Sequence, residues 1–134
     1  MSKAPRVGCG VVLLKDGAIL LIQRLRQPEA GSWSLPGGKV DWGEPTPVAA
    51  AREVAEELGV VAQDLKLLCV VDLIDQGDGD HWISPVYLAD SFTGEPALME
   101  PHKHAAFGWF PLGDLPAPLA SSAAVAAQAL KTGS

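Results

Sequence analysis

The sequence has few cysteines and no long apolar run. Its 134 residues include only Cys9 and Cys69, and each lies in an apolar, strand-like stretch where an unpaired cysteine usually behaves as a small buried hydrophobe. No segment reaches the roughly 20 apolar residues that span a membrane, and residues 1–7 lack the apolar core of a signal peptide. We therefore expect a soluble, unprocessed protein in the reducing cytoplasm, with no membrane partner.

Basic residues are also scarce. Lys and Arg number 10 against 16 Asp and Glu, and the formal net charge is -6. This balance, without a basic stripe, disfavours attraction to a nucleic-acid backbone, so we expect no long DNA or RNA partner. An acidic protein can still bind a phosphorylated small molecule when divalent cations lie between its carboxylates and the anionic oxygens of the substrate.

The length and composition predict one domain over residues 1–134. At 48% hydrophobic residues the chain has enough apolar side chains for one core and no room for a second. Strand-like runs, turns and helix signals follow in the order strands, helix, strands, helix, which predicts an α/β fold with a mixed sheet and helices packed against it. The expected strands cover residues 7–14, 18–24, 66–75, 82–89 and 106–112, and the expected helices begin near 46 and 119 and end at 59 and 131.

Several segments have the composition of turns and loops. Lys15-Asp16-Gly17 predicts a hairpin turn, and residues 77–80 predict the loop between the third and fourth strands. The polar residues 26–33 lead into residues 34–38, Ser-Leu-Pro-Gly-Gly, which we interpret as a tight, exposed turn. Loops of this kind often carry the functional site.

Capping residues define the first helix. Thr46 is expected to be its N-cap, with Pro47 at the first helical position, and Gly59 ends it. The alanine-rich interior between these residues suits a helix.

The first helix has a charged face. At about 100° per residue, Arg52, Glu53, Glu56 and Glu57 fall within one arc of about 140°. An ordinary amphipathic helix with a solvated Arg52–Glu56 pair, worth a few tenths of a kcal/mol, would explain this pattern taken alone. The residues expected on the opposite, apolar side are Val48, Ala51, Val54, Ala55 and Leu58.

The neighbouring glutamates favour a metal site over that simple explanation. Glu53, Glu56 and Glu57 repel one another unless a cation lies among them, and carboxylate oxygens are the ligands that magnesium and manganese prefer. Gly37 and Gly38, ahead of the helix, allow backbone groups to approach a ligand closely, as phosphate-binding sites require. Together these features predict a divalent-metal site that acts on a phosphorylated substrate.

The spacing of these residues resembles the Nudix box. Gly38 is followed after five residues by Glu44 and after seven more by residues 52–60, Arg-Glu-Val-Ala-Glu-Glu-Leu-Gly-Val, so every specified position of the box is filled. Residues 33–38 and the flanking strands are also similar to this family, and the likeness covers most of the chain. The resemblance implies an α/β/α sandwich with a mixed sheet and a Mg²⁺-dependent hydrolase, with Mn²⁺ as a possible alternative.

The resemblance also implies roles for the box residues. Glu53, Glu56 and Glu57 would be catalytic residues that bind or position the metal, and the Gly37 carbonyl would be a further ligand. Similarity to the MutT branch makes Glu53 the expected general base, although family members differ in which glutamate takes that role. Arg52 is expected to orient a glutamate through a forked contact rather than to touch the substrate.

Three residues around the box have two readings each. Glu44 is either a turn or cap residue or a group that supports the metal ligands. Glu100 is either a surface carboxylate or, by resemblance to MutT-like relatives, a further metal ligand ahead of the aromatic strand. His104, like His102, is interpreted as an exposed loop histidine, because two histidines without further matching ligands are weak evidence for a metal site.

The substrate-binding candidates precede or open the box. Arg24 and Arg26 lie where guanidinium groups can bind phosphate, although two solvated charges are nearly as good an explanation. Lys39, directly after the glycine pair, is better placed, and Leu35 and Gly38 complete the set. Of the four tryptophans, we expect at most one or two in a substrate cleft.

Four functions compete. The first is hydrolysis of a (d)NTP to a (d)NMP and pyrophosphate, because the short chain, residues 33–44, residues 100–103 and Trp109 look most like the MutT group and its cytidine or modified-nucleotide branch. The second is an ADP-ribose or nucleotide-sugar pyrophosphatase, ranked lower because no proline follows the box until Pro85. The third, a catalytically inactive nucleotide-binding module, conflicts with the intact glutamates, and RNA cap removal conflicts with the acidic charge. A homodimer is possible, but no interface pattern is legible.

Overall fold

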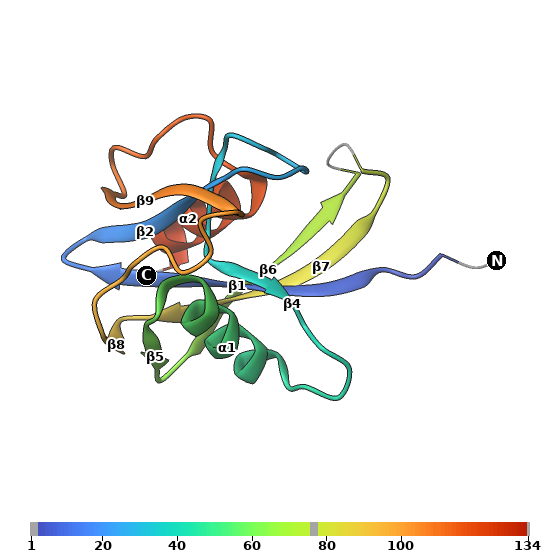
Figure 1. Ribbon diagram of the computed structural model, residues 1–134, viewed down its shortest axis with the longest axis horizontal. Coiled ribbons are helices and arrows are strands. Elements are labelled where there is room, and N and C mark those ends of the chain that lie inside the picture. The colour runs from blue at the N-terminus through green and yellow to red at the C-terminus, as the bar shows by residue number, and fades with distance from the viewer. Residues whose placement is uncertain (1–2, 76–77, 134) are drawn as a thin grey trace.

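A mixed sheet forms the centre of the molecule (Figure 1). The computed structural model describes residues 3–75 and 78–133, and the strands of this sheet are β1 (Arg6–Lys15), β2 (Ala18–Arg24), β3 (Trp33–Ser34), β4 (Gly37–Lys39), β6 (Lys66–Ile74), β7 (His81–Ala89) and β9 (His104–Pro111). The main path runs β3-β2-β1-β7-β6, while β4 pairs with β1 and β9 pairs with β2. The sheet is mixed because β1 pairs antiparallel with β2 and parallel with β7.

Two helices cover opposite faces of this sheet (Figure 1): α1 (Thr46–Leu58) and α2 (Ser121–Gly133). The side chains of β1 alternate between them, since Val11 and Leu13 pack in the core with α1 and Val12 packs in the core with α2. Burial on both faces explains why β1 is apolar at successive positions. The result is the expected α/β/α sandwich.

A small second sheet lies beside α1 and consists of β5 (Val61–Gln63) and β8 (Ser91–Thr93). The sequence analysis did not predict these two strands, nor β3 and β4, because each has only two or three residues. The five expected strands and both helices are present, with ends that differ by at most two residues. Of the expected loop at residues 77–80, Gly77 lies outside the described residues.

The predicted N-cap of α1 is wrong by one residue. Pro45, with extended backbone angles, is the N-cap, and Thr46 is the first helical residue. The Thr46 hydroxyl does not cap the helix but lies 2.6 Å from the Tyr87 hydroxyl, a tertiary contact that local sequence does not show. The predicted end is confirmed, because Gly59 adopts a left-handed φ of 70° and donates its N–H to the Ala55 carbonyl.

The predicted exposed turn at residues 34–38 is wrong for residues 34–36, whereas Gly38 is exposed and Gly37 is partly exposed. Ser34, Leu35 and Pro36 are buried, and the Pro36 carbonyl accepts a hydrogen bond from the Val11 N–H at 2.9 Å. The segment is buried because β4 continues directly from it and pairs with β1. This pairing places the two glycines of β4 against α1, where Gly37 is partly buried and Gly38 remains exposed.

The apolar face of α1 differs from the helical-wheel expectation. Val48 and Ala55 were assigned to the buried side but are exposed, whereas Glu57 was assigned to the charged side and is buried. The wheel fails because α1 contacts β1, β4, β5 and β7 from several directions, so its buried arc is not set by polarity alone. The residues of α1 that are buried are Ala49, Ala50, Val54, Glu57 and Leu58.

The two cysteines are free thiols in different environments. Cys9 is buried, and burial is the main cause that raises the pKa of its thiol to about 11. Cys69 is only partly buried, so the expectation of a fully buried side chain is wrong there. Among the described residues, no helix has the length and hydropathy that a membrane crossing requires.

Candidate metal-binding and active site

Arg52 is the centre of a charged network on the exposed side of α1. Its Nε and Nη2 atoms donate to the two carboxylate oxygens of Glu44, at 2.8 and 2.9 Å. Its Nη1 donates to Glu53 at 3.1 Å and to Glu56 at 2.9 Å. Nη2 also donates to the Lys39 carbonyl at 3.1 Å, which ties the helix to β4. Arg52 therefore makes the predicted forked contact, and its partner in the fork is Glu44.

The pKa values of this network follow its hydrogen bonds. The forked contact is the main cause that lowers the pKa of Glu44, and it is also the main cause that raises the pKa of Arg52. Glu44 additionally accepts the Asp41 N–H at 3.1 Å. The reading of Glu44 as a turn residue is confirmed by this bond, while its support of the metal ligands, here through Arg52, stays a prediction.

Glu57 belongs to a second, buried group. The Gly37 N–H donates to its Oε1 at 2.7 Å, and His104 Nε2 lies 3.3 Å from its Oε2. Glu100 completes the group, in which one ligand atom from each of Glu57, Glu100 and His104 lies within 4.8 Å of the others. Glu57 and His104 are both buried, so this group is largely shielded from solvent.

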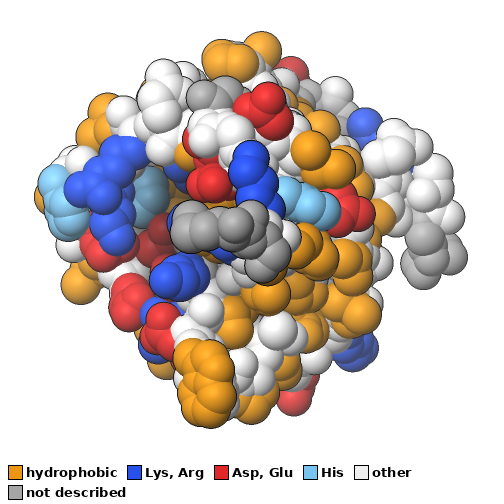
Figure 2. Space-filling view, turned by 90° about the vertical axis from the view of Figure 1, so that its right-hand side faces the viewer, with side chains coloured by type: hydrophobic (Ala, Val, Ile, Leu, Met, Phe, Trp, Pro, Cys, Tyr) orange, Lys and Arg blue, Asp and Glu red, His pale blue; other side chains and the backbone are white. Residues whose placement is uncertain are grey.

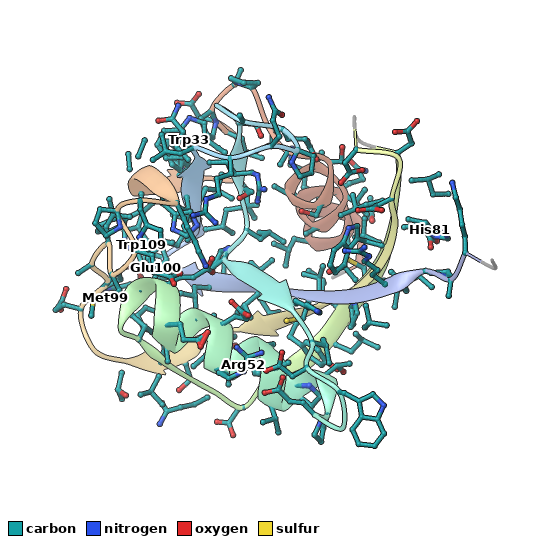
Figure 3. All side chains as sticks on the ribbon, turned by 45° about the vertical axis from the view of Figure 1, so that its right-hand side comes forward. Trp33, Arg52, His81, Met99, Glu100 and Trp109 are labelled. Atoms are coloured by element: carbon teal, nitrogen blue, oxygen red, sulfur yellow. The ribbon has the colours of Figure 1, made fainter. Side chains whose placement is uncertain are left out.

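The loop that carries Glu100 is fixed to the end of α1. The Met99 N–H donates to the Glu57 carbonyl at 3.1 Å, and the Ala97 N–H donates to the Leu58 carbonyl at 3.0 Å. Figure 3 shows Glu100 beside this end of the helix, while Arg52 lies farther along it. The free carbonyls at the helix C-terminus therefore position a carboxylate that is distant in sequence.

Burial and like charge disfavour ionisation of two glutamates. Burial is the largest cause that raises the pKa of Glu57, partly offset by hydrogen bonds from His104 and Gly37, and the charge of Glu100 raises it further. Burial also raises the pKa of Glu53, with a further contribution from the charge of Glu57 and an opposing one from Arg52. A cation among these carboxylates would remove the repulsion and stabilise their charged forms.

The donor set fits a divalent metal. Carboxylate oxygens suit hard divalent cations and imidazole suits several transition metals. His104 Nδ1 is buried and has no hydrogen-bond partner within the described residues, so nothing there fixes this nitrogen as a donor. Of the predicted metal ligands, Glu57 and Glu100 meet in this group, whereas Glu53 and Glu56 contact Arg52 and Gly37 contributes its N–H.

His104 is the residue that the sequence analysis missed. It was interpreted as exposed, yet it is 7% exposed and contacts Glu57, whereas His102 is exposed as expected. His104 begins β9, and its pairing with Arg24 at the end of β2 brings it over α1. The residue spacing around His102 and His104 contains no signal for this contact, because it depends on how β9 pairs with β2.

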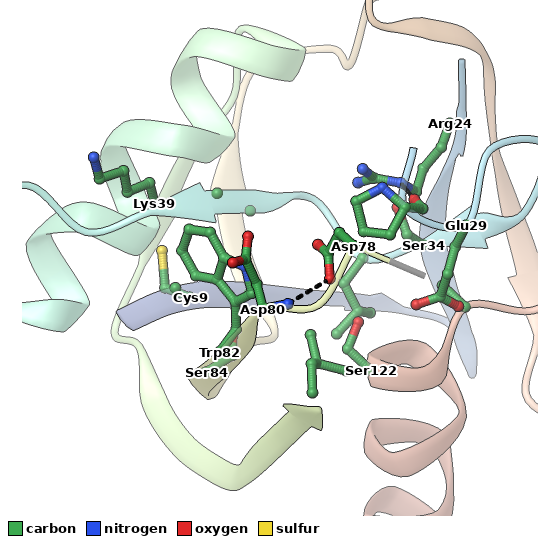
Figure 4. A pocket seen from close by; sticks show the side chains of 18 residues that line it. Cys9, Arg24, Glu29, Ser34, Lys39, Asp78, Asp80, Trp82, Ser84 and Ser122 are labelled. Atoms are coloured by element: carbon green, nitrogen blue, oxygen red, sulfur yellow. Dashed lines mark hydrogen bonds between the residues drawn. The ribbon is translucent and has the colours of Figure 1, made fainter. Parts of the chain in front are cut away.

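A pocket of about 290 Å³ opens beside these groups (Figure 4). Four of the five substrate-binding candidates line it, and Arg26 does not. Trp82 is the only tryptophan among the described lining residues, and the expectation of at most one or two tryptophans in a substrate cleft stays a prediction. The four candidates that line the pocket are Arg24, Leu35, Gly38 and Lys39.

Gly37 and Gly38 join the pocket to the glutamates. A Cβ atom on Gly38 would lie 2.5 Å from the Glu53 carboxylate, and a Cβ atom on Gly37 would overlap the Cys9 carbonyl. Glycine is therefore required at position 37, where the clash is with the backbone of β1, whereas a side chain at position 38 would displace the Glu53 carboxylate. The same close approach places the carboxylates of Glu53 and Glu57 next to Gly38 and Gly37, two residues that line the pocket.

Comparisons with known proteins agree with this geometry. A family model described as the NUDIX domain matches residues 4–130, so the chain belongs to the NUDIX family, whose members generally use divalent metals. A crystal structure of a MutT NUDIX hydrolase from Burkholderia pseudomallei has a TM-score of 0.93 and 55% sequence identity, covering 96% of this chain and 99% of that one.

Two curated relatives differ in their named substrates. The chain is 38% identical over 112 residues to an ADP-ribose pyrophosphatase from Methanocaldococcus jannaschii, covering 84% of this chain and 65% of the relative. It is 52% identical over 54 residues to a putative 8-oxo-dGTP diphosphatase 2 from Mycobacterium tuberculosis, covering 40% of this chain and 38% of the relative. The chain thus spans less than two thirds of the length of either relative, and the two names do not agree on a substrate.

Proposed function

We propose that this chain is a metal-dependent pyrophosphohydrolase whose substrate is a nucleoside triphosphate, cleaved to the monophosphate and pyrophosphate. One observation carries the proposal: Gly37, whose N–H donates to Glu57 of the buried metal-binding group at 2.7 Å, lines the same pocket as Arg24 and Lys39. Excess negative charge beside positively charged side chains suits a metal-bound, anionic substrate.

The residues divide the chemistry among them. Glu57 and Glu100, with Glu53 and Glu56, would hold Mg²⁺, or Mn²⁺ in its place. The bound metal would neutralise phosphate charge and increase the acidity of the attacking water. Glu53, whose pKa is raised mainly by burial, would accept the proton of that water. Arg52 would keep Glu53 and Glu56 in place while its fork remains on Glu44.

The pocket residues would bind the rest of the substrate. Lys39 would contact phosphate oxygens, Arg24 would contact the substrate from the opposite side of the pocket, Leu35 would form an apolar wall, and Gly38 would leave room for the phosphate chain. Arg26, which is exposed and outside the pocket, would not take part.

The similarity to a MutT NUDIX hydrolase supports the triphosphate proposal. A second candidate, an ADP-ribose or nucleotide-sugar pyrophosphatase, is supported by a relative named ADP-ribose pyrophosphatase that matches over 84% of this chain. Both reactions require the same metal site and differ in what the pocket binds. The third candidate, a catalytically inactive nucleotide-binding module, has less support because all three glutamates of the Nudix box are present.

The remaining proposals concern the binding partners, the domain organisation and the cellular location of the protein. Figure 2 shows acidic and basic side chains interspersed on one face, with no continuous basic stripe among the described residues there, which supports a small nucleotide over a long nucleic acid. We further propose a single domain over residues 1–134 and a cytoplasmic setting, with a homodimer as a possibility.

A hydrolysis panel with resolved products tests this function. The substrates are normal, oxidised and methylated nucleoside triphosphates, ADP-ribose and nucleotide sugars, each with and without Mg²⁺, run beside Glu56→Gln and Glu57→Gln. Turnover of one triphosphate to monophosphate and pyrophosphate, lost in both variants, is the expected result. Turnover of ADP-ribose alone selects the second candidate, and nucleotide binding without any turnover selects the inactive module.

A further inference from the structure

The pocket has two chemically different sides (Figure 4). Lys39 lies at one side, next to the glycines of β4, whereas Glu29 and Ser122 lie at the opposite side, next to the start of α2. Arg24 also lies on the Glu29 side, where its Nε donates to the Pro28 carbonyl at 2.8 Å. Asp78 lies between them. Because carboxylates repel phosphate oxygens, the phosphates of a nucleotide are favoured near Lys39 and the base is favoured near Glu29.

Glu29 is constrained through its backbone and its side chain. Its φ is 61°, a left-handed conformation that residues other than glycine rarely adopt and that recurs at functional sites. Ser32 donates two hydrogen bonds to the Glu29 carbonyl, from its N–H at 3.1 Å and its hydroxyl at 2.5 Å. The Ser121 N–H donates to Glu29 Oε2 at 2.9 Å, so the carboxylate is fixed at the N-terminus of α2.

The other carboxylate oxygen of Glu29 remains available to a ligand. Within residues 3–75 and 78–133, Oε1 of Glu29 makes no hydrogen bond. An ionised carboxylate accepts hydrogen bonds and cannot donate them. A fixed acceptor in a pocket with apolar walls fits a heteroaromatic ring that presents an N–H donor at its edge, and the apolar lining residues include Pro28, Leu35, Leu73 and Ala120.

We propose that Glu29 determines the base specificity of the pocket by selecting nucleobases that present an exocyclic amino group. The proposal rests on the proposed function, in which this pocket binds a nucleotide. Cytosine and adenine carry an amino group where uracil and hypoxanthine carry a carbonyl, and guanine carries a 2-amino group that hypoxanthine lacks. A carbonyl group facing Glu29 would place two hydrogen-bond acceptors opposite each other with no proton between them. This arrangement costs more binding free energy than the loss of one contact.

Equilibrium binding of nucleoside monophosphates tests this specificity apart from catalysis. CMP against UMP, AMP against IMP and GMP against IMP are measured by calorimetry, with and without Mg²⁺. In at least one pair the wild type is expected to bind the amino member about 10- to 100-fold more tightly, as for a hydrogen bond to a charged group. Glu29→Gln, which replaces one acceptor oxygen by an amide donor, is expected to reduce that ratio to less than about threefold. Glu95→Gln, at an exposed glutamate outside this pocket, is the matched control and should keep the wild-type ratio.

Several outcomes overturn the proposal. These are equal binding within every pair, a preference that survives in Glu29→Gln, and binding of none of the monophosphates. If Glu29 has a purely structural role at the start of α2, Glu29→Gln would lower the melting temperature and weaken the binding of all nucleotides by the same factor. This result also overturns the proposal. An amino preference without hydrolysis of any substrate would instead reject the proposed function and leave this proposal standing.

Discussion

The two groups of carboxylates on α1 differ in what neutralises them. Glu44, Glu53 and Glu56 share the guanidinium of Arg52, which donates to all three. Glu57 lies on the buried side with Glu100 and His104, where Lys103 contacts Glu100 alone, at 3.4 Å. Three carboxylates share one guanidinium in the first group, and neither group is neutral within the protein chain. The second group is the more deeply buried one, with the side chains of Glu57 and His104 each 8% exposed. Because water screens buried charges less, this difference indicates that a cation stabilises the protein most at the second group.

The largest expected effect comes from removing the central carboxylate of the buried group. Glu57→Gln should decrease kcat/KM by about 10³-fold or more, because metal charge stabilisation contributes several kcal/mol. It should also weaken Mg²⁺ binding in calorimetry, which needs no substrate. Glu95→Gln should leave both unchanged, and unchanged Mg²⁺ binding in Glu57→Gln would place the metal elsewhere.

The Arg52 group is expected to support the site without contacting the substrate. Arg52→Lys retains the charge but cannot form the fork to Glu44, so kcat should fall by about 10- to 100-fold. KM for the substrate should change little. A large rise in KM with an unchanged kcat would show that Arg52 binds the substrate directly and would remove the contrast between the two groups.

His104 tests whether the buried group acts as one unit. His104→Ala removes the side chain that contacts Glu57 and should weaken Mg²⁺ affinity by about 10-fold. His102→Ala changes an exposed histidine two residues away and is the matched control. Equal effects of the two substitutions would mean that the Glu57 contact has no role in metal binding.

The smallest effect concerns the stability of the metal-free protein. The folded-state pKa of Glu57 is raised above its unfolded value, mainly by burial, so its stabilising contribution is present at low pH and is lost as the pH rises through the folded pKa. Glu57→Gln cannot ionise. Its melting temperature relative to wild type should therefore increase from pH 4 to pH 8, by on the order of a few degrees. A difference that stays constant or decreases would contradict the raised pKa, and excess Mg²⁺ should reduce the difference by stabilising the wild type.

Residues close together in the sequence were predicted well. Arg52, Glu53 and Glu56 lie within two turns of one helix, and helical geometry alone brings them together, so the Arg52–Glu56 pair was expected and is present at 2.9 Å. The helix end at Gly59 and the five main strands were likewise visible as local signals. Leu35 was predicted less well, because it is buried by the pairing of β4 with β1 and not by any local pattern.

The sequence by itself determined the order of elements, the α/β class, the family and the glutamate-bearing helix, because these depend on periodicity and on spacing within short segments. The tertiary structure alone decided that Glu57 is buried, that His104 contacts it, and that Glu29 lies at the start of α2. Each of these joins segments far apart in the chain. Their distances depend on the pairing of strands and the packing of helices on the sheet, which no local spacing encodes.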